Sequence, residues 1–360
     1  MHASSADRIR KLHSDVVDVL IERGVVRHFV PSEFGGTHGS FSNLMPNIRA
    51  LAMRCTSAAW CGAIYAVAAR MAAYLPRHTQ QEIWLDGPDT PICASFRATG
   101  HAQPAAGGWV LSGQWHSLSG IDFAAWMLVC IEPSGEERAP RYAAVPKSRQ
   151  GIRVIDDWHT LGMRGTGSKS IELDNVFVPR DRTFLKSELW AGRSSHATGP
   201  GYHVSPIAAD PHLFMAAALG ASIAALGYWS SVFGNTPPAA EMGAAYARSA
   251  AEIDAAYLLV ERGCETADRG GLPPALAARN ARDASLAAEM VLTAVSRLFK
   301  HGGSQMHFEH SALQRVWRDI QTLTSHVALR PDINFGQYVR SAWTTDLIGH
   351  AELKTSREAA

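Results

Sequence analysis

Apolar residues follow a helical period in the first part of the chain. Between residues 6 and 86 they recur at three- and four-residue intervals, and the clearest stripe consists of Leu44, Ile48, Leu51, Ala52, Cys55 and Ala59. This period places them on one face of a helix. Residues 58–74 are rich in Ala and Met, which predicts a buried central helix. A proline and two adjacent glycines within residues 29–36 predict a loop before it.

Between about residue 90 and residue 185 the pattern changes to short strands. Residues 109–115 follow a Gly-Gly turn and residues 125–131 form an apolar run; the shorter candidates are 142–145, 152–155, 170–173 and 176–178. Several strands at this spacing indicate an antiparallel, barrel-like domain. Pro179 lacks the N–H that a sheet requires, so it should end the last strand.

Helical periods return after a long loop. Residues 186–211 are rich in Gly, Ser, His and Pro and show no period, as is typical of a lid or substrate loop. Apolar stripes then follow within residues 286–298 and 313–327. The pattern therefore predicts an α+β fold in three parts. These are an N-terminal helical domain (1–88), a middle β-domain (89–185), and a substrate loop with a C-terminal helical bundle (186–360), which the family resemblance given below implies to be a four-helix bundle.

Composition and charge exclude several classes of partner. The chain is 46% hydrophobic and 19% charged, with a net charge of +1 and no long run of one sign. We therefore expect neither nucleic acid nor an anionic membrane surface as a partner. The start lacks a signal-peptide pattern. The apolar run 214–229 is too short to span a membrane and carries glycines, so it predicts a buried helix. These features predict a soluble, cytoplasmic protein.

The cysteine and histidine spacings do not predict a metal site. The five cysteines are scattered and none forms a CxxC pair, which argues against a disulfide framework or a zinc site. His301, His307 and His310 crowd a glycine-rich loop, but their spacing does not place two ligands on one helical face. We predict no metal.

The segment 158–170 is the most distinctive in the chain. Its glycines would let backbone N–H groups approach an anion, and three polar side chains add donors. The residues concerned are Gly162, Gly165, Gly167, Arg164, Thr166 and Ser168. It is not a Walker loop, because Ser168 stands before Lys169 and a strand follows. Taken alone, the pattern favours a glycine-rich hairpin without a ligand.

Four further motifs change that interpretation. Together with Trp-x2-Leu-Gly-Met-Arg-Gly-Thr-Gly-Ser at 158–168, they are VPSEFGG (30–36), SAAW (57–60), LSGQWHSLSG (111–120) and LQR-x2-RD (313–319). In order and spacing the set resembles the acyl-CoA dehydrogenase superfamily. It resembles more specifically the branch of two-component flavin-dependent monooxygenases.

The resemblance implies both a reaction and a set of binding residues. The expected enzyme takes reduced FMN or FAD from a separate reductase and uses O2 to hydroxylate or oxidise a small aromatic or amine-bearing substrate. A homotetramer or homodimer is also implied. A hydroxyl near flavin N5 recurs in the family, and Ser119, followed by Ser117, is the candidate here. The expected cofactor-binding residues are Ser95, Trp115, Ser119, Arg164, Gly165, Thr166, Gly167 and Ser168.

His326 stands where the dehydrogenases of the superfamily carry a catalytic glutamate. No Asp or Glu occurs between Asp319 and Asp332, so the carboxylate base is missing. An imidazole titrates near neutrality and could take a phenol or amine proton, or hydrogen-bond to flavin-bound oxygen. By spacing alone, a single histidine near an apolar stripe is more often structural. The resemblance makes His326 the predicted catalytic residue.

Two other functions stay open at this point. One is a flavin-dependent dehydrogenase or oxidase, which the missing glutamate disfavours for acyl-CoA substrates. The other is a biosynthetic member of the family that has lost redox chemistry. No arginine precedes Phe233-Gly234, so the adenine-contacting Arg-Gln-Phe-Gly element is absent, and a transiently bound reduced flavin is expected in place of tightly held FAD.

Overall fold

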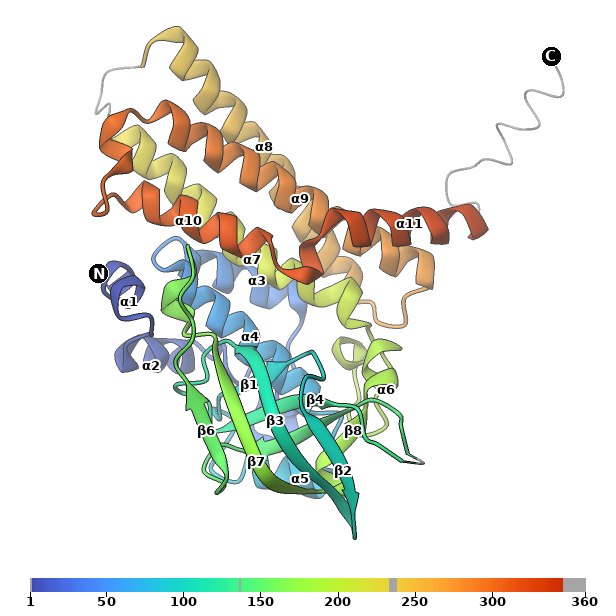
Figure 1. Ribbon diagram of the computed structural model, residues 1–360. Helices are drawn as coiled ribbons and strands as arrows, with labels where there is room; N and C mark the ends of the chain where they lie inside the picture. Colours follow the sequence, from blue (N-terminus) through green and yellow to red (C-terminus); the bar gives the residue numbers. More distant parts are fainter. Residues whose placement is uncertain (1, 136, 233–237, 346–360) are drawn as a thin grey trace, which may run out of the picture.

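The computed structural model describes residues 2–135, 137–232 and 238–345. Phe233 and Gly234, at which the adenine-contacting element was sought, lie outside these ranges. Within them, a layer of long helices packs above two β-sheets, and shorter N-terminal helices lie beside and behind the sheets (Figure 1).

The N-terminal region is helical, as predicted. It contains α1 (His2–Ile9), α2 (Ser14–Glu22), α3 (Phe41–Ala52), α4 (Thr56–Ala72) and α5 (Arg77–Ile83). Every residue of α4 is buried, because this Ala-rich helix has neighbours on all sides. The predicted loop at 29–36 holds only one 3-10 turn, η1 (Ser32–Phe34).

Eight strands form two sheets of four. One sheet has the order β1 (Ile92–Ser95), β4 (Trp126–Ile131), β5 (Arg141–Pro146), β8 (Thr183–Leu185); the other has β2 (His101–Ala105), β3 (Gly108–Leu118), β7 (Lys169–Pro179), β6 (Ile152–Ile155). The described residues form no closed barrel, and β1 pairs with β4 in parallel. The prediction of an antiparallel barrel-like domain was therefore too specific.

The two strands predicted at 170–173 and 176–178 form a single strand, β7. β7 runs without a break through the Asp174-Asn175 pair to Pro179, where it ends as predicted. Asn175 adopts a left-handed backbone conformation with φ 52°, and the partner strand β3 shifts register opposite it. A bulge of this kind absorbs a turn-like pair without ending the strand.

The C-terminal region supplies most of the helical layer. It contains α6 (Lys186–Trp190), α7 (Pro206–Ser231), α8 (Ala240–Ala267), α9 (Pro274–His301), α10 (Ala312–Thr324) and α11 (Pro331–Thr345). α7 packs against α8, α9 and α10, but equally closely against α3. The layer thus draws on both ends of the chain, which a purely C-terminal bundle does not describe.

α7 is apolar and long enough to cross a membrane by length and composition alone. In the structure, 67% of its most apolar window is buried inside the protein. The helix belongs to the largest core cluster, which also contains residues of α4, β1, β4 and β5. This agrees with the predicted buried helix.

The apolar stripe at 313–327 extends beyond its helix. α10 ends at Thr324, and the 3-10 turn η6 (Val327–Leu329) follows with His326 as its N-cap. Val327 is 59% exposed, so its place in the stripe does not reflect burial. His326 consequently lies at a bend and not within a helix.

Glycines on α7 allow a test of the α3–α7 contact. A Cβ on Gly220 would lie 2.1 Å from the carbonyl oxygen of Arg49 on α3, whereas a Cβ on Gly227 would meet nothing within 4 Å. Gly220→Ala should therefore lower the free energy of unfolding by about 1–3 kcal/mol, since the clash is with backbone. Gly227→Ala should raise it by up to about 1 kcal/mol through helix propensity. Urea denaturation of both variants measures this, and equal effects would contradict the close packing.

Candidate functional site

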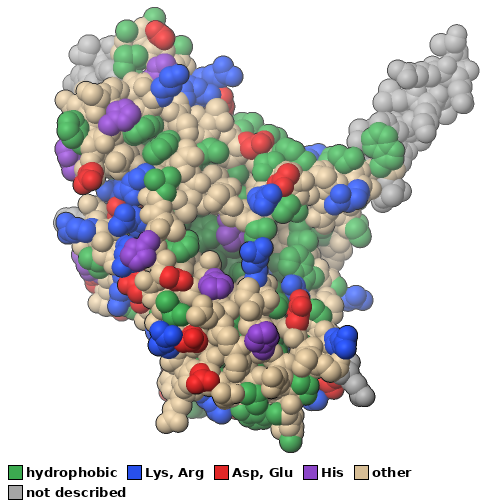
Figure 2. Space-filling view, viewed as in Figure 1, with side chains coloured by type: hydrophobic (Ala, Val, Ile, Leu, Met, Phe, Trp, Pro, Cys, Tyr) green, Lys and Arg blue, Asp and Glu red, His purple; other side chains and the backbone are tan. Residues whose placement is uncertain are grey.

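A cavity of about 440 Å³ lies between the sheets and the helical layer. The space-filling view shows a recess in this part of the molecule, with hydrophobic and histidine side chains inside it (Figure 2). Its walls come from α4, β1, β3, the segment 158–168 and the end of α10. Six of the predicted site residues line it together, namely Ser95, Ser117, Ser119, Thr166, Ser168 and His326.

Hydroxyl groups form a continuous hydrogen-bonded chain on one wall. The indole Nε1–H of Trp60 donates to Ser119 Oγ at 3.0 Å. Ser119 Oγ lies 2.7 Å from Ser168 Oγ, which lies 2.7 Å from Thr166 Oγ1. Thr166 Oγ1 donates to the carbonyl of Met163 at 2.7 Å. The chain therefore starts at a group that can only donate and ends at one that can only accept.

These two ends fix the direction of every proton in between. Thr166 gives its hydrogen to the Met163 carbonyl, so it must accept from Ser168. Ser168 must in turn accept from Ser119. Each hydroxyl has one hydrogen, and all three are used within the chain. Only oxygen lone pairs remain to face a ligand, so this wall is a hydrogen-bond acceptor.

Ser117 is presented by a bulge in β3. The register of β3 and β7 shifts between Trp115 and Leu118, and Ser117 has a left-handed backbone with φ 62°. Such a conformation costs free energy in a residue with a side chain and is found preferentially at functional sites. The Ser117 side chain is exposed in the cavity, whereas Ser95 Oγ donates to the His116 carbonyl.

The structure places the other predicted binding residues elsewhere. Trp115 is fully buried in the core between the sheets and donates to the Cys130 carbonyl. Arg164 donates to the Asp7 carbonyl on α1. Gly165 packs against Ala6 and Ser57, and Gly167 lies next to Asp122. None of these four predicted residues lines the cavity, so Thr166 and Ser168 are the predicted binding residues of the glycine-rich loop that face it, beside Trp158 and Met163.

Helix α10 holds the loop in place. Asp319 is buried and accepts a hydrogen bond from Met163 N–H at 2.6 Å. Thr322 accepts from Gly162 N–H at 3.0 Å, and Arg318 donates to the Leu161 carbonyl while pairing with Asp7. Met163 has φ 54°, an unusual backbone conformation that these contacts stabilise. Arg318 and Asp319, the Arg-Asp pair of the sequence motif, thus fix the conformation of the loop and are called the loop clamp below.

His326 is a neutral imidazole between two aromatic rings. Its ring meets Trp60 and Phe214 edge-on, with centroid distances of 5.3 and 5.1 Å. Burial lowers its pKa to about 4. Its Nδ1 accepts from Ala328 N–H at 3.3 Å, so the proton of the neutral ring is on Nε2. The side chain therefore offers a hydrogen-bond donor.

A second, smaller cavity also reaches His326. It measures about 180 Å³ and lies between α6, α7, η6 and α11. Its walls are mainly apolar, with Phe96, Trp190, Pro206, Ile207, Pro211, Phe214, Val327, Ala328 and Ile333 among the lining residues. Asp210 and Asn334 also line it and are buried. His326, Phe96 and Val327 line both cavities.

Sequence reasoning missed Asp210. This carboxylate lies in the first turns of the apolar helix α7, where a charge is rarely buried without a partner. Its partner is Arg70 of α4, fully buried, whose Nη2 donates to Asp210 Oδ1 at 3.0 Å. Arg70 also donates to the carbonyls of Gly201 and Val204. An acidic residue inside an otherwise apolar helix was the available signal.

The larger cavity fits a flavin by the chemistry of its lining. Its hydroxyl wall can accept from the N5–H of a reduced ring, and the aromatic Trp60 and Phe96 offer ring contacts. Arg97 and Arg330 line it as cations that could meet a phosphate. Among the described residues, no group of His, Cys, Asp and Glu side chains could hold a metal ion.

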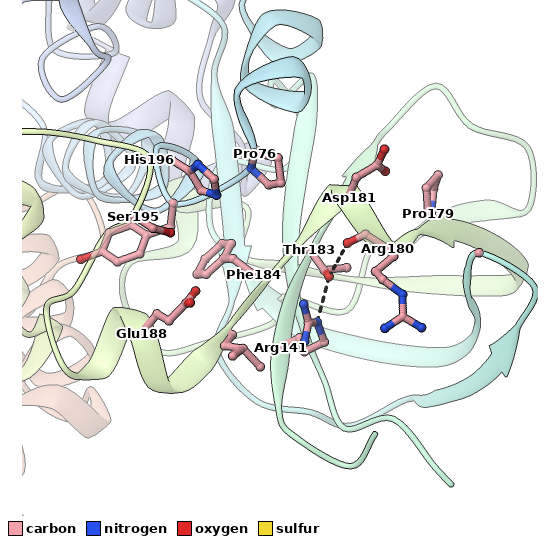
Figure 3. Close-up of a pocket in the computed structure, with 13 residues that line it drawn as sticks. Pro76, Arg141, Pro179, Arg180, Asp181, Thr183, Phe184, Glu188, Ser195 and His196 are labelled. Atoms are coloured by element: carbon pink, nitrogen blue, oxygen red, sulfur yellow. Dashed lines mark hydrogen bonds between the residues drawn. The ribbon is translucent and has the colours of Figure 1, made fainter. Parts of the chain in front are cut away.

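A third cavity, of about 500 Å³, lies away from these two and shares no lining residue with them. Figure 3 shows its residues, with Arg141 donating to Thr183 Oγ1 and Thr183 donating to the Arg180 carbonyl. Arg141 and Arg180 both stack over Trp109. These side chains are occupied with one another, which indicates a structural role.

Comparisons with known proteins agree with this geometry. The family described as "Acyl-CoA dehydrogenase, C-terminal domain" matches residues 213–331. The chain is 26% identical over 356 residues to the flavin-dependent monooxygenase, oxygenase subunit HsaA, of Rhodococcus jostii (strain RHA1), covering 93% of each chain. It is 26% identical to the FADH(2)-dependent resorcinol hydroxylase, oxygenase component, of Rhizobium sp. (strain MTP-10005), covering 92% of this chain and 87% of that one.

Solved structures show the same fold. The crystal structure of 3-HSA hydroxylase from Rhodococcus sp. RHA1 superposes with a TM-score of 0.90 at 24% identity, covering 95% of this chain and 93% of that chain. The likeness extends over the helical layer and both sheets, since it spans nearly the whole chain.

Asp319 of the loop clamp makes the free energy of unfolding depend on pH in a defined direction. Burial raises the pKa of Asp319 to about 6, above its ordinary value. The folded protein therefore holds this proton more tightly than the unfolded chain, and stability is lost as pH rises from about 4 through 6. Asp319→Asn keeps an acceptor for Met163 N–H but does not titrate. The stability of the native protein relative to this variant should fall by up to about 3 kcal/mol between pH 4 and pH 7.

Chemical denaturation of both proteins at a series of pH values measures the difference, because all other groups titrate alike in the two. A difference that does not change with pH would contradict the assigned burial of the Asp319 carboxylate.

Proposed function

We propose that this chain, a member of the acyl-CoA dehydrogenase superfamily, is the oxygenase component of a two-component flavin-dependent monooxygenase. Its C-terminal part matches the superfamily's C-terminal domain, and relatives along nearly its whole length are oxygenase components. A separate reductase supplies the cofactor, reduced FAD or FMN, and O2 is the co-substrate. The substrate is a small aromatic compound.

The observation that carries this proposal is the position of His326 between two cavities. An engineered apolar cavity of about 150 Å³ binds benzene, so the cavity of about 180 Å³ suits a single small ring. The cavity of about 440 Å³ has room for the larger flavin ring system. In this proposal, one imidazole borders both the cofactor site and the substrate site.

The residues that line the two cavities have separate roles in this proposal. A bound reduced flavin supplies the electrons that activate O2, and one oxygen atom passes to the substrate while the other leaves as water. The hydroxyls of Ser119, Ser168 and Thr166 accept hydrogen bonds from the cofactor. His326 holds its proton at Nε2 and donates toward the oxygen or the substrate, because Nδ1 is occupied by Ala328 N–H. The aromatic rings of Trp60 and Phe214 exclude water around it.

Three further properties belong to this proposal. We assign residues 1–88, 89–185 and 186–360 to successive parts of the functional unit, with a homotetramer or homodimer as the assembly. We assign the protein to the cytoplasm, which the burial of α7 inside the fold supports.

The first test combines cofactor binding with oxygen labelling. Anaerobic titration with FADH2 and FMNH2 should show binding, and a single turnover under ¹⁸O2 with a phenolic substrate should place one labelled atom in the product. His326→Leu should still bind reduced flavin but lose product formation by about 10²-fold or more, because it removes the donor between the cavities. Oxygen consumed by this variant should appear as hydrogen peroxide.

Failure of the native protein to bind either reduced flavin would overturn the proposed function. Binding without incorporation of the label into any of a panel of phenols and anilines would count against the aromatic substrate class.

The direction of the hydroxyl chain predicts a preference for reduced flavin. N5 of reduced flavin carries a hydrogen and donates, whereas N5 of oxidised flavin accepts, and the chain offers only acceptors. Thr166→Val removes the acceptor of the Ser168 hydrogen and frees it for the cofactor. The ratio of the dissociation constants for oxidised and reduced flavin should therefore fall about tenfold.

Thr160→Val is the matched control, since Thr160 also donates to a backbone carbonyl, that of Gly162, but does not line the cavity. Fluorescence and absorbance titrations give both constants. An unchanged ratio in Thr166→Val, or an equal change in the control, would show that the chain does not set the preference.

A further inference from the structure

Two buried polar side chains at the α7–α11 end of the smaller cavity, Asp210 and Asn334, present hydrogen-bond acceptors to it, and the partly buried Gln337 of α11 also lines it. Asp210 gives one carboxylate oxygen to Arg70, and no donor among the described residues reaches the other. Asn334 uses both hydrogens of its amide, donating to Ser285 Oγ at 2.7 Å and to the Ala328 carbonyl at 2.9 Å. Its amide oxygen is left without a donor among the described residues.

The orientation of both groups is determined by their partners. The Ala328 carbonyl can only accept, so the nitrogen of Asn334 must face it and the oxygen cannot exchange places with it. Arg70 is fully buried, so its guanidinium needs a counter-charge, and Asp210 supplies it. Burial raises the pKa of Asp210, and the Arg70 guanidinium opposes this shift. Because the fully buried guanidinium needs this counter-charge, the carboxylate stays ionised, and its second oxygen is a strong acceptor in an apolar setting.

A buried acceptor that lacks a donor costs free energy. Asp210 and Asn334 are only 4% exposed each, and the remaining walls are mainly apolar. A ligand lowers this cost only when it brings a hydrogen of its own. A ligand with an anionic or purely accepting group would place like partial charges together, and one without polar groups would leave both acceptors unsatisfied.

Helix geometry relates these acceptors to the reactive position. Asp210 and Phe214 are four residues apart on α7 and therefore lie on the same face, one turn apart. The Phe214 ring contacts the His326 ring. One turn of helix is about 5.4 Å, which is comparable to the length of a six-membered ring. A ring held at Asp210 by one substituent therefore reaches toward His326 with its other side.

We propose that the cavity between α7 and α11 is a recognition subsite for the uncharged hydrogen-bond donor of a small aromatic ring, a hydroxyl or amino group, which binds Asp210 and Asn334. This inference rests on the proposed function in naming the occupant as the substrate. It adds the group by which that substrate is selected and the residues that select it. Arg70 is a positioning residue, since it fixes the carboxylate without contacting the ligand.

The test uses three monosubstituted benzenes that differ in the hydrogen-bonding group on the ring. Phenol carries a donor, anisole has the same oxygen with the hydrogen replaced by methyl, and acetophenone carries only an acceptor. Calorimetric titration of the full-length, flavin-free protein should give phenol at least about tenfold tighter binding than anisole or acetophenone. Anisole binding as tightly as phenol would overturn the proposal without any variant.

Asp210→Asn localises the effect. The amide oxygen of the new side chain replaces the oxygen that Arg70 holds, so its NH2 group faces the cavity and the acceptor becomes a donor. The preference should then reverse in favour of acetophenone by about tenfold. Asp283→Asn is the control, because Asp283 is an equally buried, arginine-paired carboxylate that does not line the cavity. It should leave the ratio of phenol to anisole unchanged.

Near-UV circular dichroism verifies that each variant is folded. If Asp210→Asn does not fold, Asn334→Leu removes the second acceptor, and the phenol preference should then drop several-fold. An unchanged preference in the folded variants would contradict the assigned residues. Titration of the same preparation with reduced flavin separates the two proposals, because flavin binding tests the proposed function and the probe ratio, measured without flavin, tests the subsite.

Discussion

The buried carboxylate of Asp319 accepts a hydrogen bond from Met163 N–H. This bond attaches the glycine-rich loop to helix α10. Met163 has a left-handed backbone, which turns its carbonyl toward Thr166 and Trp158. That carbonyl ends the hydroxyl chain on the cavity wall. If Met163 moved, the chain would lose its terminal acceptor, and the protons of Ser168 and Ser119 would no longer have a fixed direction.

The same helix end also places His326, so one element positions both the acceptor wall and the donor opposite it. α10 ends at Thr324, and His326 follows as the N-cap of η6. Its Nδ1 is used by Ala328 N–H, while the Ala328 carbonyl accepts from Asn334 in the smaller cavity. The backbone N–H and C=O of Ala328 thus relate the tautomer of the histidine to the orientation of the amide. Preorganised dipoles of this kind need no rearrangement when a ligand binds.

The extent to which the sequence predicted this site depended on the kind of signal. Apolar composition identified α4 and α7 as buried helices, because a helix with few polar residues must be enclosed. The family motifs brought Ser119, Ser168 and His326 together, which no spacing argument could do across 200 residues. The motifs did not predict which residues of a strand face the core and which face the cavity. Trp115 and Ser117 belong to one motif, but the bulge between Trp115 and Leu118 sends one into the core and the other into the cavity. Asp210 was missed because its partner, Arg70, is 140 positions away on another helix.

The absence of a carboxylate at position 326 acquires a sharper meaning from the structure. A carboxylate does line the smaller cavity, but it comes from α7 and is paired with Arg70. An ion-paired carboxylate is a hydrogen-bond acceptor more than a base, because taking a proton would leave the buried guanidinium without its counter-charge. His326, with a pKa of about 4 and its proton at Nε2, is likewise poorly suited to remove a proton at neutral pH. Neither of these two side chains is therefore a strong base for the abstraction of a carbon-bound proton. In the proposed function they provide instead a hydrogen-bond acceptor for the substrate's own donor and a hydrogen-bond donor toward the transferred oxygen.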